Sequence, residues 1–486
     1  MVSKSTLLKI LLLAFLVKGI YFFGSYYVFN NVVDDINTNI GFLTLDHDVE
    51  DHFIPLENWW NTGEYYRELS NGKVVYASRP PGYAPFYLPL YVLTNPEAAR
   101  SLFALLNYLL DVISCLYLFL LVFELTKRKK IAWFSVLLYI VLPFISVYTN
   151  RGKSEPLSTI LIIVSSYYFL KHLNYKKYSN LLISSFFLSL SILTRPSIAL
   201  FTILPFFVLI YYHRISFSRI IKNLVMFGIP IIILLGGWVL RSSVKEGRFI
   251  PILDMAAFAT PEIRTLFNFI GSINGDIQGW VPGSEAEWFS PPGSKNYSAE
   301  ASTQNPFDPS TFSASFSLDS LISLRDAYWN VKIDGEALNK QDSLFVRKAD
   351  KLLTTYKTER SVWHRIKTEV KMFTRFICIK QAHGTMLQKS TFWFQLGKLY
   401  WLILYYIVIL GSFFGLILGF WRSENWVVVL GLFIVFYMFI HANLLGLIEN
   451  RYLAAIFPYL TILAGYFYYH VYEVIKSRSR SSSKLI

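Results

Sequence analysis

A dense cluster of ionisable side chains follows the first long apolar segment of the chain. The stretch Asp46–His52 contains four carboxylates and two imidazoles. Carboxylates held this close raise one another's pKa, and such clusters often accept protons or bind cations. The mixture of His and acidic residues is also compatible with a divalent metal, although the spacing alone defines no metal site. A solvated acidic surface explains the cluster equally well.

A second candidate is a cation in a stiff turn. Arg79 is followed by two prolines, by Gly82 and Tyr83, and then by the apolar segment Pro85–Leu93. A guanidinium group can hold a phosphate through two parallel hydrogen bonds, and the prolines reduce the entropy lost on binding. The alternative is an arginine at the membrane interface that keeps its charge among the lipid headgroups.

Further ionisable residues lie at the ends of apolar segments. They are Lys153, Glu155, Arg241 and Arg451. Charges at these places often only mark the boundary of the membrane. If all four lie on the same side of the membrane as Asp46–His52, they can converge on one cavity, which is where functional charges of membrane proteins gather.

Composition predicts the elements that must position these residues. Of all residues 54% are hydrophobic and only 16% are charged, and the apolar residues form long uninterrupted runs. Crossing about 30 Å of hydrocarbon takes about 20 apolar residues, so the sequence predicts an all-α polytopic membrane protein with about ten, and at most about thirteen, transmembrane helices. The predicted spans are Leu7–Phe29, Leu102–Leu125, Ile131–Tyr148, Pro156–Leu170, Leu181–Leu193, Ile198–Tyr212, Leu224–Leu240, Leu399–Trp421, Trp426–Leu447 and Tyr452–Val474.

A cleaved signal peptide is an alternative reading of the first span. The run is longer than a usual signal core and has no small-residue cleavage site, which favours a permanent helix. Cys115 lies inside a predicted span and Cys378 lies far from it in the sequence, so no disulfide framework is expected.

The positive charges predict how the chain is oriented. Lysine and arginine are concentrated before the first span, at 127–130, at 171–177, at 214–222, at Arg422 and at the carboxyl end. These positions fall on alternate loops, and basic loops remain cytoplasmic. We therefore expect a multi-pass cell membrane protein with both termini cytoplasmic. The net charge of +14 is spread over separate loops, which favours contact with anionic lipid and argues against nucleic-acid binding.

This topology predicts three regions. Residues 1–241 form an amino-terminal membrane module with an outer loop at 30–101, residues 242–395 form an extracytoplasmic segment, and residues 396–486 form the last spans and a basic tail. In the first outer loop, the apolar residues of 52–60 recur at helical spacing and predict a juxtamembrane helix with Pro55 in its first turn and Gly63 at its end. Phe345–Phe373 predicts one or two further amphipathic helices.

These residues resemble the GT-C glycosyltransferases, in particular the branch of protein O-mannosyltransferases and lipid A aminoarabinose transferases. The resemblance covers nearly the whole chain. It rests on six features in the same order: Asp48 with Gly63 and Tyr65, Arg79–Tyr83, Glu155–Leu157, Arg195-Pro196, Trp238–Arg241 at the close of a helix, and Arg451-Tyr452 before Pro458. The chain departs from the family pattern at His52, where a Tyr is frequent, and at Ser242, where an Asn is frequent. These departures affect the expected substrate more than the expected chemistry.

The resemblance implies an inverting transfer of a sugar from a polyprenyl- or dolichyl-phosphate donor to an extracytoplasmic lipid, glycan or protein acceptor. It implies Asp48 as the general base and Arg79, Arg241 and Lys153 as ligands of the donor phosphate. We also expect Glu155, His52, Tyr83 and Arg451 to bind substrate. The Trp59-Trp60 pair either lines the acceptor groove or lies at the membrane interface.

Two other functions remain open from the sequence. A polymerase or ligase of lipid-linked glycans would also use a large outer loop, with its arginines mainly in the late loop. A flippase or secondary transporter would show inverted repeats, broken helices and charges at the middle of the membrane. The sequence contains no evident repeat, and the singled-out charges gather at helix ends.

Overall fold

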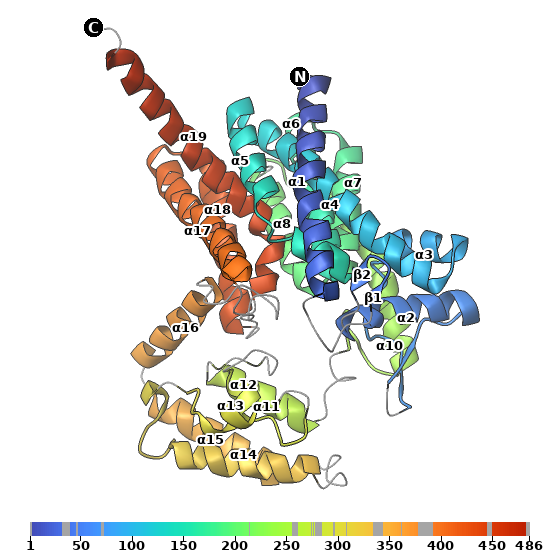
Figure 1. Cartoon of the computed structure of the whole chain (residues 1–486), viewed down its shortest axis with the longest axis vertical. Coiled ribbons are helices and arrows are strands. Elements are labelled where there is room, and N and C mark those ends of the chain that lie inside the picture. The colour runs from blue at the N-terminus through green and yellow to red at the C-terminus, as the bar shows by residue number, and fades with distance from the viewer. Residues whose placement is uncertain are drawn as a thin grey trace. The chain divides into compact units, whose positions relative to one another are not determined.

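The computed structural model describes most of the chain as α-helix (Figure 1). It describes residues 2–31, 39–44, 47–69, 72–212, 214–254, 261–273, 275, 277, 284–294, 297–307, 309–333, 344–360, 362–377, 392–444 and 450–482. The chain divides into two compact units, of which the first contains residues 1–254, 381–434 and 453–486 and the second contains residues 255–380 and 435–452.

The first unit is a bundle of apolar helices. Its members are α1 (Lys4–Asn31), α3 (Ala84–Leu93), α4 (Pro96–Thr126), α5 (Lys129–Val141), α6 (Ser154–Tyr175), α7 (Tyr178–Thr194), α8 (Ile203–Tyr212), α9 (Phe217–Ile231), α10 (Gly237–Glu246), α17 (Phe392–Trp421), α19 (Phe457–Ser482) and the first part of α18 (Asn425–Phe439). Helix α4 packs against α1, α3, α5 and α6, and α19 packs against α5 and α17. As far as the structure describes them, the predicted spans fall on one helix or on consecutive helices, and residues 445–447 of the predicted span Trp426–Leu447 lie outside the described residues.

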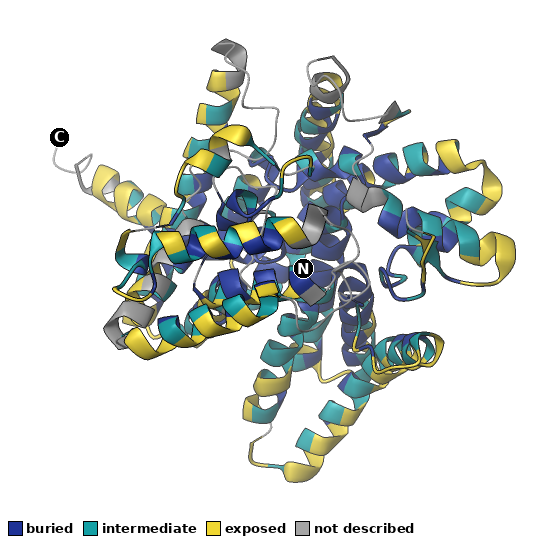
Figure 2. Ribbon diagram, turned by 90° about the horizontal axis from the view of Figure 1, so that it is seen from below, coloured by how far each residue is buried: buried dark blue, intermediate teal, exposed yellow. Residues whose placement is uncertain are grey.

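The apolar surface of this unit is what a membrane requires. Among the described residues, five helical runs are long and apolar enough to cross a bilayer, namely Lys4–Tyr27, Pro96–Thr126, Phe217–Glu246, Gln395–Trp421 and Asn425–Asn443. Leu8, Leu16, Ile20 and Phe23 of α1 are more than half exposed. Individual helices change from buried on one side to exposed on the other (Figure 2). Large apolar side chains exposed in rows are stable against lipid and costly against water, which confirms an all-α polytopic membrane fold.

The first outer loop folds into short elements between the first spans. Two-residue strands pair as antiparallel hairpins, β1 (Asn39–Ile40) with β2 (Leu43–Thr44), and β3 (Arg67–Glu68) with β4 (Val74–Val75). Between the hairpins lies α2 (His47–Thr62), the predicted juxtamembrane helix. Gly63 ends it as predicted, since its φ is +77° and its amide donates to the carbonyl of Trp59.

Two local predictions, one in the first outer loop and one on α10 (Gly237–Glu246), were wrong. Pro55 lies in the middle of α2 and not in its first turn, because the helix begins at His47. Since proline has no amide hydrogen, one intrahelical hydrogen bond is absent there, and the buried Phe53 and Leu56 hold the helix by packing instead. The helix that carries Trp238 and Arg241 does not close at Arg241 but continues to Glu246, where Gly247 adopts a φ of +66°.

The second unit has its own hydrophobic core. It contains α11 (Pro261–Ser272), α12 (Glu285–Trp288), α13 (Ala299–Thr303), α14 (Leu318–Ile333), α15 (Leu344–Glu359) and α16 (Val362–Ile377). Phe345, Ala349 and Tyr356 of α15 are buried in a cluster with aromatic residues of α11, α12 and α14. These positions follow the predicted helical spacing and confirm α15 as an amphipathic helix.

Candidate active site

The amino-terminal half of α2 presents an acidic residue to two arginines. Asp48 lies in the first turn of α2, and its side chain lies outside the described part of the structure. One turn later the Asp51 carboxylate is 8% exposed. It forms an ion pair with Arg67 of β3 and approaches Nη2 of Arg79 at 3.6 Å. Two guanidinium groups therefore face one carboxylate of α2.

The turn 79–83 is fixed against the end of α7. The Gly82 amide donates to the carbonyl of Leu193 at 3.2 Å. A Cβ atom on Gly82 would lie 2.2 Å from the Thr194 nitrogen and 2.4 Å from the Leu193 carbonyl carbon. The two backbones approach each other more closely than any side chain allows, so only glycine fits here.

Tyr83 joins this turn to α2 and to the segment before α6. Its ring stacks on the imidazole of His52, with centroids 4.4 Å apart, and its hydroxyl donates to the carbonyl of Gly152 at 2.8 Å. Both rings are buried. This contact brings His52, Tyr83 and Gly152, which are far apart in sequence, to one place.

The amino terminus of α6 carries the next group of charges. Lys153 immediately precedes α6, and Glu155 lies in its first turn. The Glu155 carboxylate is buried and forms an ion pair with Nη1 of Arg195 at 2.7 Å, while the same Nη1 donates to Ser154 Oγ at 3.1 Å. The first amides and the dipole of a helix favour an anion at its amino terminus, and Lys153 adds a full positive charge at that place.

Electrostatics link the two groups of charges. Burial raises the pKa of the Tyr83 hydroxyl well above its usual value, and the Glu155 carboxylate raises it further. Arg195 and Arg79 act in the opposite direction on the same pKa. Tyr83 therefore stays protonated as a hydrogen-bond donor, and it lies within electrostatic range of residues from the turn, from α6 and from the end of α7.

Arg241 lies on α10 and binds backbone on both sides of the second hairpin. Its Nη1 donates to the carbonyl of Tyr76 at 2.5 Å, and its Nη2 donates to the carbonyl of Tyr65. Its guanidinium carbon lies 5.4 Å from the ring centroids of Tyr65 and Trp238. The Tyr65 hydroxyl in turn donates to the carbonyl of Arg79 at 2.8 Å. Arg241 thus reaches the turn 79–83 through the hairpin.

The structure places the other predicted residues as follows. Arg451 lies in the short helix η9 (Asn450–Ala455), its guanidinium carbon 5.6 Å from the Tyr452 ring, and both residues belong to the second unit. Trp59 and Trp60 of α2 are 45% and 57% exposed, as expected of residues at an interface. Within the described residues no group of three His, Cys, Asp or Glu side chains could hold a metal ion.

Three participants were not selected from the sequence. Asp51 was one of four similar carboxylates, and Arg67 belonged to no motif. Arg195 was noted only as part of an Arg-Pro turn. The sequence contains one usable signal for Arg195, which is a charged residue at the junction of two apolar segments. The sequence does not show that Arg67 and Asp51 form an ion pair, because this contact depends on the fold of the β3–β4 hairpin, which carries Arg67.

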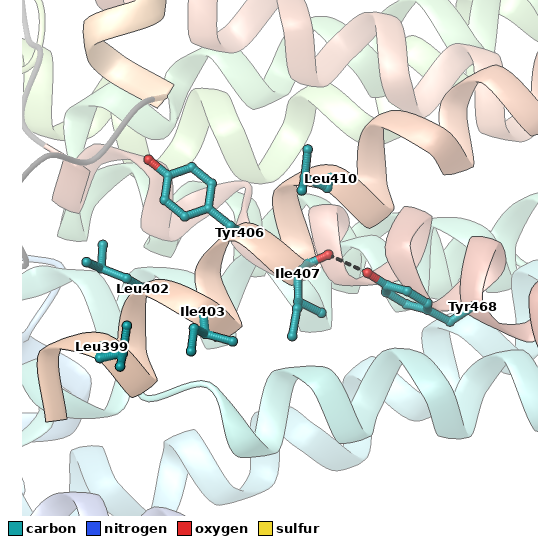
Figure 3. Close-up of a pocket in the computed structure, with 7 residues that line it drawn as sticks. All are labelled: Leu399, Leu402, Ile403, Tyr406, Ile407, Leu410 and Tyr468. Carbon is teal, nitrogen blue, oxygen red and sulfur yellow. Dashed lines mark hydrogen bonds between the residues drawn. The ribbon is translucent and has the colours of Figure 1, made fainter. Parts of the chain in front are cut away.

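An apolar groove on the first unit lies apart from these charges in sequence. It is lined by aliphatic residues of α17 and by two tyrosines, and Figure 3 shows the Tyr468 hydroxyl turned onto the α17 backbone. That hydroxyl donates to the carbonyl of Ile407 at 2.8 Å. The groove suits an apolar chain such as lipid and offers no charged group for chemistry among its lining residues.

Comparisons with known proteins agree with the fold. Residues 91–238 match the family described as dolichyl-phosphate-mannose-protein mannosyltransferase. The oligosaccharyltransferase AglB from Archaeoglobus fulgidus, solved in complex with an inhibitory peptide and a dolichol-phosphate, superimposes with a TM-score of 0.52 at 11% identity. That match covers 99% of this chain and 52% of AglB, so the chain spans about half the length of that protein. No curated protein matches the sequence.

Two further solved structures complete the comparison. The same archaeal enzyme tethered to an acceptor peptide with the NVT sequon matches with a TM-score of 0.55 at 10% identity, over 97% of this chain and 50% of that chain. ArnT from Cupriavidus metallidurans bound to undecaprenyl phosphate gives a TM-score of 0.37 at 11% identity, over 93% and 77% of the chains, which is too low to establish a common fold by itself. The chain therefore shares its fold with the archaeal oligosaccharyltransferase, and residues 91–238 match the mannosyltransferase family, both in agreement with the resemblance that the motifs indicated.

Proposed function

We propose that this protein transfers a sugar from a polyprenyl-phosphate donor to an acceptor on the extracytoplasmic side of the membrane. One observation carries the proposal. Four cationic side chains, Arg67, Arg79, Lys153 and Arg195, gather with Asp51 and Glu155 around Tyr83 and the amino terminus of α6. Fixed positive charges beside a helix amino terminus suit a phosphate.

The reaction breaks one bond and forms one. An acceptor hydroxyl oxygen attacks the anomeric carbon, the bond from that carbon to the phosphate oxygen breaks, and the polyprenyl phosphate leaves with the electron pair. The acceptor proton passes to a carboxylate. Attack opposite the leaving group inverts the anomeric configuration in one step. We assign the proton to Asp48 because it lies in the first turn of α2, one turn before Asp51.

The departing phosphate needs its negative charge stabilised. The Arg79 side chain is 27% exposed and lies 3.6 Å from the Asp51 carboxylate, and we assign its planar guanidinium group to the donor phosphate. Lys153 supplies a second charge at the start of α6. Arg241 holds the hairpin through one hydrogen on each terminal nitrogen, and the second hydrogen of each nitrogen remains for a phosphate oxygen. Donors fixed in this way stabilise charge without reorganising during the reaction.

The sugar is assigned to the buried polar groups next to these cations. Glu155 is oriented by Arg195 and can accept hydrogen bonds from sugar hydroxyls. The stacked His52 and Tyr83 form the wall between α2 and the turn. Arg451, which lies in the second unit, is also proposed to bind substrate.

A second function has one observation in its favour. The archaeal structures that share the fold are oligosaccharyltransferases, so the second candidate function is the transfer of a preassembled glycan from a lipid-linked donor. A comparison of donors separates the two functions. Purified protein is incubated with polyprenyl-phosphate monosaccharides and, separately, with lipid-linked oligosaccharides, and the release of the lipid carrier is measured. Release from the first group alone supports the proposal, release from the second alone supports the alternative, and release from neither contradicts both.

A further inference from the structure

A lysine and an aspartate form an ion pair between two membrane helices. Lys18 lies near the midpoint of α1, and Asp111 lies near the midpoint of α4. Lys18 Nζ is 3.0 Å from Asp111 Oδ2, and each side chain is 1% exposed. Both helices belong to runs that are long and apolar enough to cross a bilayer. Charges at such a depth are expensive and in membrane proteins mark functional sites by default.

The pair is fully provided with polar neighbours. The Ser146 hydroxyl donates to Asp111 Oδ2 at 2.7 Å and accepts from Lys18 Nζ at 3.1 Å. Ser114 Oγ lies 3.3 Å from Asp111 Oδ1, and Lys18 Nζ lies 4.4 Å from the centroid of the Tyr139 ring. Hydrogen bonds of this kind are what allow a buried ion pair to recover its desolvation cost.

Ser146 differs from the other polar neighbours because it begins a segment that continues to the candidate site. It is the first residue of η1 (Ser146–Arg151), a short 3₁₀ helix that packs against α1 and α4. The next residues are Gly152, which accepts the Tyr83 hydroxyl, and Lys153, which precedes α6. Ser114, by contrast, lies on α4 itself and bonds within its own helix and to the Tyr139 hydroxyl of α5. Of these neighbours, Ser146 is the one that belongs to the segment leading to the candidate site.

We infer that Lys18 and Asp111 are positioning residues for the site and act through Ser146. They fix the start of η1, and a short helix of this kind transmits that position to Gly152 and Lys153. The inference rests on the proposed function, because positioning is meaningful only if the segment 151–155 binds a substrate. The competing explanation is that the pair only holds α1 and α4 together.

A pair of serine variants separates these explanations. Ser146→Ala removes the bond from the carboxylate to η1 and leaves the ion pair, whereas Ser114→Ala removes a bond to the same carboxylate that does not reach η1. We expect Ser146→Ala to lower turnover between about 10- and 100-fold, the range that small misplacements of binding groups cause. Ser114→Ala should stay within a factor of about 2, and Ser146→Thr, which keeps the hydroxyl, should recover most of the loss.

Amide hydrogen exchange provides a measurement that does not depend on activity. The amides of residues 147–153 should exchange faster in Ser146→Ala than in Ser114→Ala, while the melting temperatures of the two variants remain alike. Equal exchange in the two variants, or faster exchange without loss of turnover, would overturn the inference. If the wild type releases no lipid phosphate from any donor, the proposed function fails, and the exchange comparison still decides whether the ion pair anchors η1.

A double variant tests whether the charges matter beyond holding the helices. Lys18→Met with Asp111→Leu replaces the pair by apolar groups of similar size, which proteins often tolerate without loss of folding. We expect a folded protein with the same low turnover and the same fast exchange at 147–153 as Ser146→Ala. Wild-type turnover in this variant would mean that packing alone is enough and would contradict the role assigned to the pair.

Discussion

Asp51 shows how a carboxylate can belong to a site without doing its chemistry. It is bonded by Arg67 and approached by Arg79, so we propose that it orients the two guanidinium groups toward the site. We propose that Asp48, one turn earlier on α2, takes the proton of the acceptor.

The first prediction at this scale is that Asp48→Asn abolishes transfer and preserves donor binding. Asn keeps the shape of Asp but cannot accept a proton at neutral pH, so turnover should fall by about 100-fold or more. Lipid-phosphate release and donor affinity are measured on the same preparation. Glu50→Gln is the control, since Glu50 lies on the same helix and is only partly buried. More than about a tenth of wild-type turnover in Asp48→Asn would show that another group is the base.

A second prediction concerns the phosphate. Arg79→Ala should weaken donor binding by about 1–3 kcal/mol, the usual worth of a charge-assisted hydrogen bond, and Arg79→Lys should restore little of it because a single ammonium cannot replace the planar fork. The control is Arg248→Ala, which removes an arginine that is also ion-paired, to Asp254, but is half exposed and outside the cluster. Binding of the labelled donor is measured for each variant. Equal affinities throughout would reduce Arg79 to an interfacial residue.

At the scale of elements, the site depends on a close approach between the turn 79–83 and the end of α7. The prolines stiffen the turn, and Gly82 lets it touch the backbone of Leu193 and Thr194. Arg195 follows directly and reaches back to Glu155. One backbone contact therefore sets the distance between the cation of the turn and the charges at the start of α6.

Gly82→Ala should accordingly disrupt the site more than its size suggests. The added methyl group would lie 2.2 Å from the Thr194 nitrogen, and backbone cannot move aside as a flexible side chain can. Overpacking of this kind costs about 1–3 kcal/mol or more, so we expect a lower melting temperature and loss of turnover. Gly24→Ala in α1 is the matched control, because its methyl group would meet nothing within 4 Å. Similar stability of the two variants would mean that the turn does not dock on α7.

At the scale of the whole molecule, the distribution of basic residues predicts which side of the membrane the site faces. Both termini of the first unit lie at one end of its helices, and α2 and α10 lie at the other (Figure 1). The basic segment Lys127–Lys130 follows α4, which begins near the site and runs away from it. The positive-inside tendency then predicts that the site and the segment 242–395 are extracytoplasmic.

Single cysteines test this orientation in a Cys378→Ser background, in which the remaining Cys115 is buried. Thr303→Cys in α13 should react with an impermeant thiol reagent in intact cells, whereas Lys129→Cys should react only after lysis. Both positions are exposed in the structure, so a difference between them reports the side of the membrane and not burial. The reverse pattern would place the site in the cytoplasm and contradict the proposed donor and acceptor.

The sequence by itself determined the membrane spans, the end of α2 at Gly63, the amphipathic α15 and the candidate residues Asp48, Arg79, Lys153 and Glu155. These depend on hydropathy, on glycine conformation and on local motifs, which are properties of short stretches. The pairs Asp51 with Arg67, Glu155 with Arg195 and Lys18 with Asp111 were decided only by the tertiary structure. Which side chains meet depends on how each helix is rotated and packed, and the free energy that fixes this is shared among many distant residues.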